Sequence, residues 1–138
     1  METFLYVLKN KYADFDGRAR RNEYWMFVLF NVIITIIGYA ISLFGIFLES
    51  AALGILGTAF LFITGLGLLI PSLAVGVRRL HDTNRSGWLL LIGLIPFIGF
   101  IILLVFLVSE GTQGPNNYGP DPKNPINELD GLGKNELV

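Results

Sequence analysis

Nine ionisable side chains gather in two short polar segments, one before the first long apolar stretch and one after the second. The planar guanidinium of arginine binds carboxylates and phosphates equally well. If the two apolar stretches form a helical hairpin, both segments lie at the same end of it. We then expect Glu23 to pair with Arg78 or Arg79, and Asp82 to pair with an arginine of the first segment. The nine are Arg18, Arg20, Arg21, Glu23, Arg78, Arg79, His81, Asp82 and Arg85.

This charge cluster has two interpretations. In the first it is structural, a lock made of internal salt bridges and contacts to lipid headgroups. In the second it is a binding site for an anionic lipid head or for an acidic segment of a partner protein. Both interpretations place the chemistry of the chain at one end of the helices.

His81 and Asp82 are adjacent, which raises the question of acid–base or metal chemistry. His81 is the only histidine of the chain and there is no cysteine, so the usual zinc-ligand sets are excluded. No serine has a base and an orienting group at a recognisable spacing. We therefore expect no catalytic residue, no metal site, no cofactor and no enzymatic activity.

Long apolar stretches must position the cluster. The chain has 138 residues, 53% of them hydrophobic and 15% charged, whereas a soluble domain carries about 25% charged residues. Glu49 is the only formal charge between residues 25 and 77, and residues 87–108 carry none. This pattern indicates an all-α integral membrane protein. The three predicted transmembrane helices cover residues 24–48, 51–77 and 88–108, with a tight turn at Glu49 and a polar loop over residues 78–87.

The third apolar stretch contains Gly93, Pro96 and Gly99 near its middle. Proline removes one helical hydrogen bond and clashes with the preceding turn, so we expect a kink at residues 91–95. The alternative is a re-entrant hairpin that pivots at Ile95-Pro96, with arms of about ten residues. A continuous span places the tail outside the cell, whereas a re-entrant hairpin leaves it inside.

Two flanking segments complete the prediction of a single membrane domain over residues 1–108 and a tail over 109–138. The helical spacing of apolar residues near the N-terminus predicts an amphipathic helix over residues 1–15, either at the membrane interface or packed on the protein's own face. The tail is rich in Gly, Pro and Asn, so we expect it to be largely disordered. The apolar residues of the first segment are Phe4, Leu5, Leu8, Tyr12 and Phe15.

Few polar side chains fall within the predicted spans. Serine and threonine hydroxyls usually bond to their own helix backbone, and we expect the amide of Asn31 to bond to another helix. The polar residues are Asn31, Thr35, Ser42, Thr58, Thr64 and Ser72. Small residues at four-residue spacing predict close helix packing. They are Gly38, Ser42, Ser50, Gly54, Thr58, Ser72 and Gly76.

The distribution of basic residues predicts orientation. Five lie before the first span and three follow the second, whereas the turn at Glu49 has none and the tail has only Lys123 near the membrane. Basic residues stay in the cytoplasm, which places the N-terminus inside and, with three spans, the C-terminus outside. The net charge of −1 gives no support for nucleic-acid binding.

Three sequence blocks together resemble the bacterial family called domain of unknown function 805 (DUF805), which comprises small inner-membrane proteins. The blocks are residues 15–25 (FDGRARRNEYW), 78–88 (RRLHDTNRSGW) and 114–122 (GPNNYGPDP). The middle block is specific, and the order and separation of the three also fit. The resemblance implies a bacterial inner-membrane location and a multi-span architecture. It implies no activity, substrate or catalytic residue.

Two functional hypotheses follow, with an enzyme as a distant third. The first is a protein that acts at the charge cluster, either through lipids, anionic ones included, or through another membrane protein or a second copy of itself. The second is a small oligomeric transporter or channel, in which a broken third helix exposes backbone carbonyls. An activity on lipid-linked substrates is the third.

Overall fold

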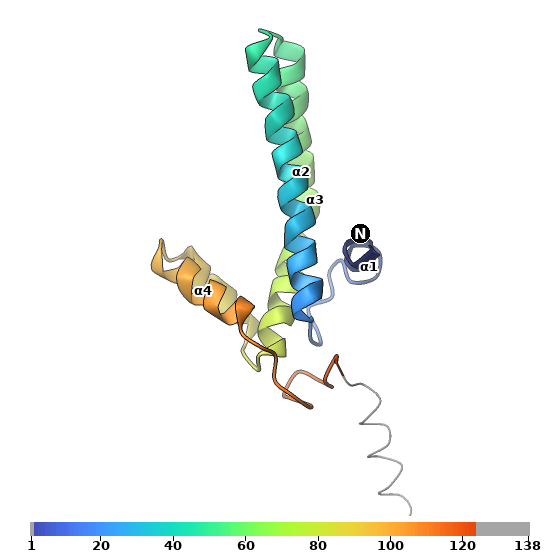
Figure 1. Cartoon of the computed structure of the whole chain (residues 1–138), viewed down its shortest axis with the longest axis vertical. Helices are drawn as coiled ribbons and strands as arrows, with labels where there is room; N and C mark the ends of the chain where they lie inside the picture. Colours follow the sequence, from blue (N-terminus) through green and yellow to red (C-terminus); the bar gives the residue numbers. More distant parts are fainter. Residues whose placement is uncertain (1, 124–138) are drawn as a thin grey trace, which may run out of the picture.

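The computed structural model describes residues 2–123 and contains four α-helices and one 3₁₀ helix in that range (Figure 1). They are α1 (Glu2–Asn10), α2 (Arg21–Phe47), α3 (Ala51–Asp82), η1 (Gly87–Leu94) and α4 (Ile98–Val108). The part of the chain that the structure describes has no β-strand, only an isolated bridge between Asn116 and Gly119. The expected all-α architecture is confirmed.

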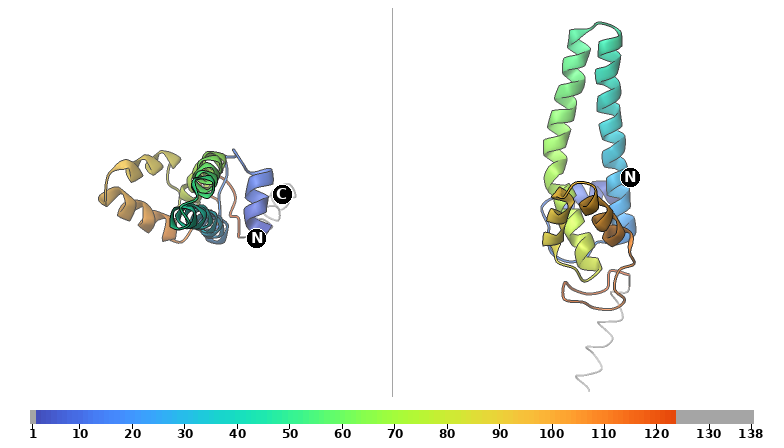
Figure 2. Two further views of the ribbon diagram at one scale, coloured as in Figure 1. Left: turned by 90° about the horizontal axis from the view of Figure 1, so that it is seen from above. Right: turned by 90° about the vertical axis from the view of Figure 1, so that its left-hand side faces the viewer.

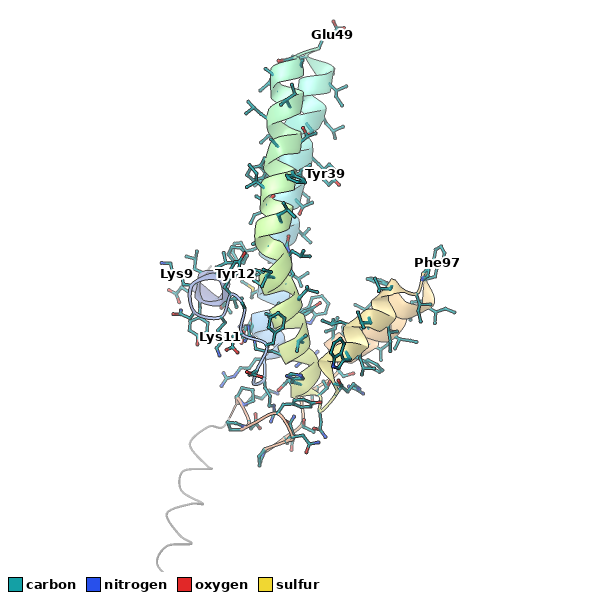
Figure 3. The ribbon with its side chains drawn as sticks, turned by 180° about the vertical axis from the view of Figure 1, so that it is seen from behind. Lys9, Lys11, Tyr12, Tyr39, Glu49 and Phe97 are labelled. Atoms are coloured by element: carbon teal, nitrogen blue, oxygen red, sulfur yellow. The ribbon has the colours of Figure 1, made fainter. Side chains whose placement is uncertain are left out.

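Helices α2 and α3 form a long antiparallel pair, called here the helical pair, and both are long and apolar enough to cross a membrane. The turn between them contains Glu49, with a positive φ of 52°, and it forms the tip of the pair (Figure 3). The predicted turn at Glu49 is therefore confirmed. The opposite end, where α2 begins and α3 ends, is called here the base.

The second span was predicted to end at residue 77, but helix α3 continues to Asp82. The predicted polar loop over residues 78–87 is therefore wrong in its first half, since Arg78, Arg79 and His81 lie on the last turns of the helix. Hydropathy marks where the apolar stretch stops, whereas arginine and leucine continue a helix well. The 32 residues of α3 correspond to about 48 Å at about 1.5 Å per residue, more than the hydrocarbon thickness of about 30 Å.

Glycines let α2 and α3 approach closely. A Cβ at Gly45 would collide with the backbone of Gly54, and one at Gly57 would collide with Ser42. A Cβ at Gly38 would run into the side chain of Leu61. The predicted close packing at Gly38 and Ser42 is confirmed, whereas Gly45 and Gly57 lie outside the spacing pattern that was singled out.

Polar side chains within the pair are satisfied locally. The hydroxyls of the serines and threonines donate to carbonyls of their own helix, and the amide of Asn31 donates to Ser72 Oγ across the pair at 3.1 Å. The expected interhelical bond of Asn31 is therefore present. The hydroxyls that bond to their own helix belong to Thr35, Ser42, Thr58, Thr64 and Ser72.

The third apolar stretch is not a continuous helix, so the prediction of a third transmembrane helix over residues 88–108 is not confirmed. It is broken into η1 and α4, and the backbone reverses at Ile95, Pro96 and Phe97, where Phe97 has a φ of 62°. Gly99 permits the reversal because a Cβ there would collide with the carbonyl of Ile92. Each arm is about 16 Å long, which is half the hydrocarbon thickness. The alternative, a hairpin that pivots at Ile95-Pro96, matches the structure.

This hairpin, residues 87–108, is called here the apolar wedge. It leaves the base sideways and flanks only the lower part of the helical pair (Figure 2), with Phe97 at its free end (Figure 3). Helix α1 lies on the other side of the pair, also near the base. The base is thus the place where every other segment meets the pair.

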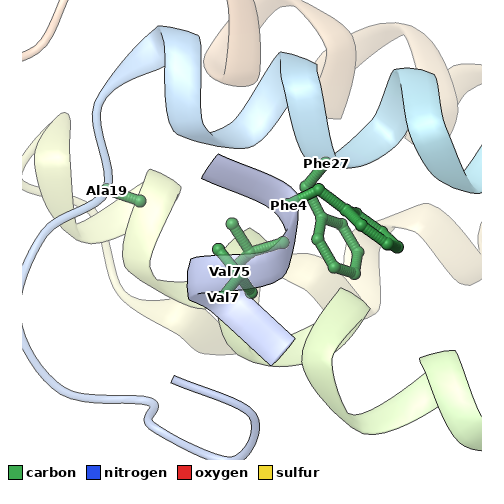
Figure 4. Close-up of a cluster of buried hydrophobic side chains, with 5 residues drawn as sticks. All are labelled: Phe4, Val7, Ala19, Phe27 and Val75. Atoms are coloured by element: carbon green, nitrogen blue, oxygen red, sulfur yellow. The ribbon is translucent and has the colours of Figure 1, made fainter. Parts of the chain in front are cut away.

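Helix α1 packs against the pair through one side. Phe4 and Val7 are buried against Phe27 of α2 and Val75 of α3 (Figure 4), and the rings of Phe4 and Phe27 lie 5.3 Å apart. The helix ends at Asn10, shorter than the predicted 1–15. Of the two predicted placements, packing on the protein's own face is observed; a location at the membrane interface stays a prediction.

A hydrogen bond from the segment after α1 closes a gap in α3. Pro71 lies inside α3 and has no N–H, so the carbonyl of Gly67, four residues earlier, lacks its helical donor. The hydroxyl of Tyr12 donates to this carbonyl at 2.6 Å. The sequence shows the proline, but it does not show which side chain replaces the missing donor.

Residues 109–123 are ordered against the base, so the prediction of a disordered tail is wrong for them; residues 124–138 lie outside the described range. The backbone N–H and hydroxyl of Thr112 both donate to the carbonyl of Asp82 at 2.8 Å, and the amide of Asn116 donates to the carbonyl of His81 at 2.9 Å. The tail thereby supplies donors to two carbonyls at the end of α3, that of Asp82 and that of His81, which also accepts from the N–H of Asn84. Composition did not reveal this order, because it comes from hydrogen bonds rather than from buried apolar surface.

The same contacts overturn the expected position of the tail, which was predicted to lie opposite the N-terminal segment that leads into α2 (up to about residue 21), called here the leader. Residues 112–119 touch both the leader, at Arg18, and the end of α3. The tail over residues 109–123 and the leader therefore lie at the same end of the helical pair. The cause is the reversal at Pro96, which returns the chain to the base.

Candidate functional site

The three sequence blocks that carry the family resemblance converge at the base. Residues 18–23 come from the leader and the start of α2, residues 78–82 from the last turns of α3, and residues 109–121 from the tail. A set of buried ion pairs at their junction is called here the clasp. It consists of Arg18, Glu23, Arg78, Arg79 and Asp82.

Arg79 is the centre of the clasp and is fully buried. Its Nε donates to the carbonyl of Leu107 at 3.0 Å, and its two terminal nitrogens bond to the carboxylate of Asp82 and to the carbonyl of Ser109. One side chain thus links the end of α3 to the end of the apolar wedge. Five donors in a fixed planar arrangement make arginine suited to this role.

Arg18, in the leader, binds the same carboxylate of Asp82. Its Nε donates to Asp82 Oδ1 at 3.0 Å, and its terminal nitrogens donate to the carbonyls of Thr112 at 2.5 Å and Gly114 at 2.7 Å. Asp82 therefore lies between two guanidinium groups and is itself buried. The expected pairing of Asp82 with a leader arginine is present.

The second ion pair of the clasp joins α2 to α3. Arg78 Nη1 donates to Glu23 Oε1 at 2.5 Å, as expected for Glu23, and the Arg78 side chain is buried. Its Nε and Nη2 have no hydrogen-bond partner within the described residues. Within the described residues, Glu23 is the one carboxylate that forms an ion pair with this buried positive charge, which is costly to leave unpaired.

Three further predicted residues, Arg20, Arg21 and Arg85, lie around the clasp and are called here the rim. Arg20 is exposed, and Arg21 lies 3.6 Å from Glu110 with both side chains largely in solvent. Arg85 stacks over the ring of Phe106, with 4.2 Å between its guanidinium carbon and the ring centroid. Arg20 and Arg21 therefore present guanidinium groups to an external phosphate or carboxylate, whereas the Phe106 ring covers one face of the Arg85 guanidinium.

His81 faces away from the clasp, toward the leader and the tail. Its Nδ1 lies 3.2 Å from the carbonyl of Gly17, and its ring stacks on Tyr118 with 3.9 Å between centroids and an angle of 6° between planes. These two residues form part of a groove between α3, η1, the leader and the tail. The structure therefore divides the nine predicted residues among the clasp, the rim and this groove.

Carboxylates outside the helices fix two turns. Backbone N–H groups of Lys123 and Gly114 donate to Asp121 and hold the pKa of its carboxyl below the usual value. A hydrogen bond from Lys11 at 2.7 Å lowers the pKa of Asp14 in the same direction. Both groups stabilise the segments that cover the base.

Several residues of the base were not predicted as site residues. Two of them, Thr112 and Asn116, attach the tail to α3 by donating to carbonyls at its end. Asp121 accepts a hydrogen bond from the N–H of Gly114 within the tail, and Tyr118 stacks on His81. The available signal was the run of Gly, Pro, Asn and Asp around Tyr118, which is typical of tight turns. Within residues 2–123, no group of three His, Asp or Glu side chains is placed to hold a metal ion.

Comparison with known proteins finds relatives in Escherichia coli, two of which are named as inner membrane proteins. Inner membrane protein YhaH of Escherichia coli K12 is 48% identical over 124 residues, which cover 89% of this chain and 98% of the relative. Inner membrane protein YhaI of the same strain is 48% identical over 126 residues, which cover 89% and 97%. Uncharacterized protein YiiR, also of that strain, is 31% identical, and the match covers 88% of this chain and 94% of the relative.

No solved structure matches the chain. The family model described as "Protein of unknown function (DUF805)" matches residues 12–120. That range contains the clasp, the helical pair, the apolar wedge and the turn at Tyr118. The resemblance of the three sequence blocks is therefore confirmed, and the chain belongs to the DUF805 family.

Proposed function

We propose that this protein acts without catalysis, through contacts with lipids of the cytoplasmic leaflet of the bacterial inner membrane. The helical pair is its transmembrane anchor, and the apolar wedge enters the cytoplasmic leaflet from the base. The leader and residues 109–123 then lie together in the cytoplasm. The wedge carries the proposal, because a charge-free hairpin exposes large apolar side chains while both its arms return to the base.

The surface of the wedge suits hydrocarbon and not water. Phe97 at its free end is 87% exposed, and Leu94, Ile98 and Phe100 beside it are also largely exposed. Exposed apolar surface of this extent marks a membrane or protein contact. Arms of about 16 Å reach the middle of a bilayer but do not cross it.

The charges of the base support its cytoplasmic placement. The leader carries five basic residues and the last turns of α3 with the following loop carry three, whereas the tip carries only Glu49. The excess of positive charge at one end favours the cytoplasmic side for that end. Because the described tail packs on the same end, the same rule favours the cytoplasmic side for the tail.

The rim supplies the sites for anionic headgroups. Arg20 and Arg21 are accessible, whereas the side chains of the clasp arginines are buried and paired with carboxylates of the clasp. A basic residue near an anionic leaflet contributes about 1 kcal/mol of attraction. In this proposal the clasp is the structural lock, and Arg20 and Arg21 are the lipid-binding part of the cluster.

A second candidate is a transporter or channel formed by several copies. The observation that favours it is the broken third segment, because interrupted helices form the binding sites of many transporters. The break, however, carries no charged side chain. A stable oligomer in lipid nanodiscs together with ion or solute flux in liposomes would support it over the lipid-contact proposal.

Single-cysteine labelling tests the proposed topology, and the chain offers a cysteine-free background. Cysteines replace Glu49 at the tip, Phe97 at the end of the wedge and Gln113 in the tail, and a membrane-impermeant maleimide is applied to spheroplasts and to inverted vesicles. We expect Glu49→Cys to react only in spheroplasts and Gln113→Cys only in inverted vesicles. Phe97→Cys should react in neither and should react after detergent is added.

Reaction of Phe97→Cys or Gln113→Cys in spheroplasts would contradict the proposal, because it would place the end of the wedge or the tail outside. For the rim, the double variant Arg20→Gln, Arg21→Gln should reduce co-purified anionic lipid in lipid-retaining particles. The matched control is Arg85→Gln, whose guanidinium is occupied by Phe106. Equal anionic lipid in both variants, or a stoichiometric partner protein in place of lipid, would overturn the role of the rim.

A further inference from the structure

A groove of about 520 Å³ opens beside the end of α3, on the side away from the clasp. One wall comes from α3 and another from η1, and the leader and the tail close the end nearest the base. The groove is separate from the rim arginines, and neither lysine nor arginine is among its lining residues. Its chemistry therefore differs from that of the charge cluster.

The long walls of the groove are apolar and continuous with the membrane-facing surface. Leu73 and Val77 line it from α3, and Leu90 and Leu91 line it from η1. Leu73 and Leu91 are also exposed at its edge, as is Trp88. Because both walls belong to segments that the proposed function places in hydrocarbon, the natural occupant is a lipid chain and not a water-soluble molecule.

The end of the groove near the base presents hydrogen-bond acceptors. Asp16 lines it, and no residue from 2 to 123 forms an ion pair with this carboxylate. Because the carbonyl of Gly17 only accepts, Nδ1 of His81 carries the proton of that hydrogen bond. In the neutral imidazole, Nε2 is then an acceptor. Tyr118 holds the imidazole in place by stacking on it.

We propose that the groove binds one phospholipid whose headgroup carries a primary ammonium. The ammonium donates to the Asp16 carboxylate and to Nε2 of His81, and one acyl chain lies between α3 and η1 along Leu73 and Val77. A negative carboxylate and a ring acceptor favour a cation with N–H donors over an anionic headgroup. The inference rests on the proposed function, because it needs the wedge to lie in the leaflet.

Native mass spectrometry of the full-length protein, released from nanodiscs of defined composition, tests the site. The three lipids are phosphatidylethanolamine, phosphatidylcholine and phosphatidylglycerol with identical acyl chains. Phosphatidylcholine keeps the positive charge but has no N–H, so it separates hydrogen bonding from simple charge attraction. We expect the wild-type protein to retain one phosphatidylethanolamine at least about tenfold more often than either of the others, as one charge-assisted hydrogen bond provides.

Two variants locate the lipid. Asp16→Asn should abolish the preference for phosphatidylethanolamine, whereas Glu49→Gln, which removes the same charge at the tip, should retain it. Leu91→Trp narrows the apolar part and should lower the retention of all three lipids. Equal retention of the three lipids by the wild type, an unchanged preference in Asp16→Asn, or unchanged retention in Leu91→Trp would overturn the inference.

Failure of this inference is distinguishable from failure of the proposed function. A protein whose Phe97→Cys variant is shielded in both preparations, but which shows no headgroup preference, would refute the groove alone. If Phe97→Cys reacts in spheroplasts, the wedge is not re-entrant and the proposed function fails whatever the lipid preference. Labelling of Phe97→Cys in the Asp16→Asn background shows in addition that the variant has folded and inserted.

Discussion

The two ends of the helical pair are held together by different physics. At the tip, Gly45 lies against Gly54 and Gly57 against Ser42, so packing of backbone on backbone supplies the contact. At the base, Asp82 lies between two arginines and the tail donates to the end of α3. Small residues suit hydrocarbon, where no water competes for dispersion contacts. Buried charges suit the base, because several partners are available there to compensate each one.

The comparison has a consequence for how each end fails. Loss of a small residue at the tip separates two helices that remain inserted, because each helix satisfies its own backbone. Loss of a charge at the base leaves its partners buried without compensation. The following experiments are ordered by expected effect, from the base to the weakest contact of the tail.

The largest effect is expected for Asp82→Ala at the base. The variant leaves Arg18 and Arg79 buried without their shared carboxylate, which should cost about 3–5 kcal/mol of unfolding free energy. Unfolding by SDS in mixed micelles measures the loss, and Glu49→Ala at the exposed tip is the matched control. If both variants lose the same small amount of unfolding free energy, the clasp does not stabilise the base.

Gly57→Leu tests the tip. The new side chain meets Ser42, so α2 and α3 must separate, at a cost of about 1–3 kcal/mol. Gly65→Leu is the control, because a Cβ at Gly65 meets nothing within 4 Å. The same unfolding assay applies. An equal loss in the two variants would show that close backbone approach does not hold the tip.

Tyr12→Phe tests the hydrogen bond to the carbonyl of Gly67. Removal of the hydroxyl should cost about 1 kcal/mol, because the carbonyl loses its only replacement donor. In a Pro71→Ala background the new N–H at residue 71 takes over this carbonyl, so Tyr12→Phe should there cost almost nothing. A double-mutant cycle in the unfolding assay measures the coupling. Additive effects would show that Tyr12 does not compensate for the proline.

The smallest effect concerns pH and the turn at Asp121. Its folded pKa lies below the usual value because Lys123 and Gly114 donate to it, so its contribution to tail stability is complete above the unfolded pKa of about 3.9. The contribution is lost as the pH falls through the folded value. A fluorophore on Gln113→Cys should gain mobility below about pH 4. In Asp121→Asn it should be mobile at neutral pH already, and an unchanged anisotropy there would contradict the assignment.

The sequence predicted what depends on hydropathy and charge pairing. The absence of charge between residues 25 and 77 except at Glu49 located the helical pair and its turn, and opposite charges in the two polar segments predicted the pairs of Glu23 and Asp82. The prediction of a third span was not confirmed, because length and hydropathy are the same for a straight helix and for two short arms. Only the local geometry of Pro96, Phe97 and Gly99 distinguishes them.

The order of the tail was also beyond the reach of composition. Thr112 and Asn116 are ordinary polar residues in a loop, and their role depends on which carbonyls at the end of α3 lie within their reach. Likewise, Tyr12 appears as one more apolar ring of a leader helix until Pro71 is considered together with it. Predictions of such contacts require the arrangement of the elements in space, which periodicity alone does not provide.

The convergence of the leader and the tail on α3 also sets a chronology for biogenesis. Arg18, Arg79 and Asp82 are synthesised before the carbonyls of Leu107, Ser109, Thr112 and Gly114 to which the arginines bond. While the ribosome is still completing the wedge, the two arginines can already pair with Asp82, but they lack the later carbonyls, and their remaining N–H groups must be solvated by water or headgroups. The base can therefore mature only after the ribosome has passed residue 114.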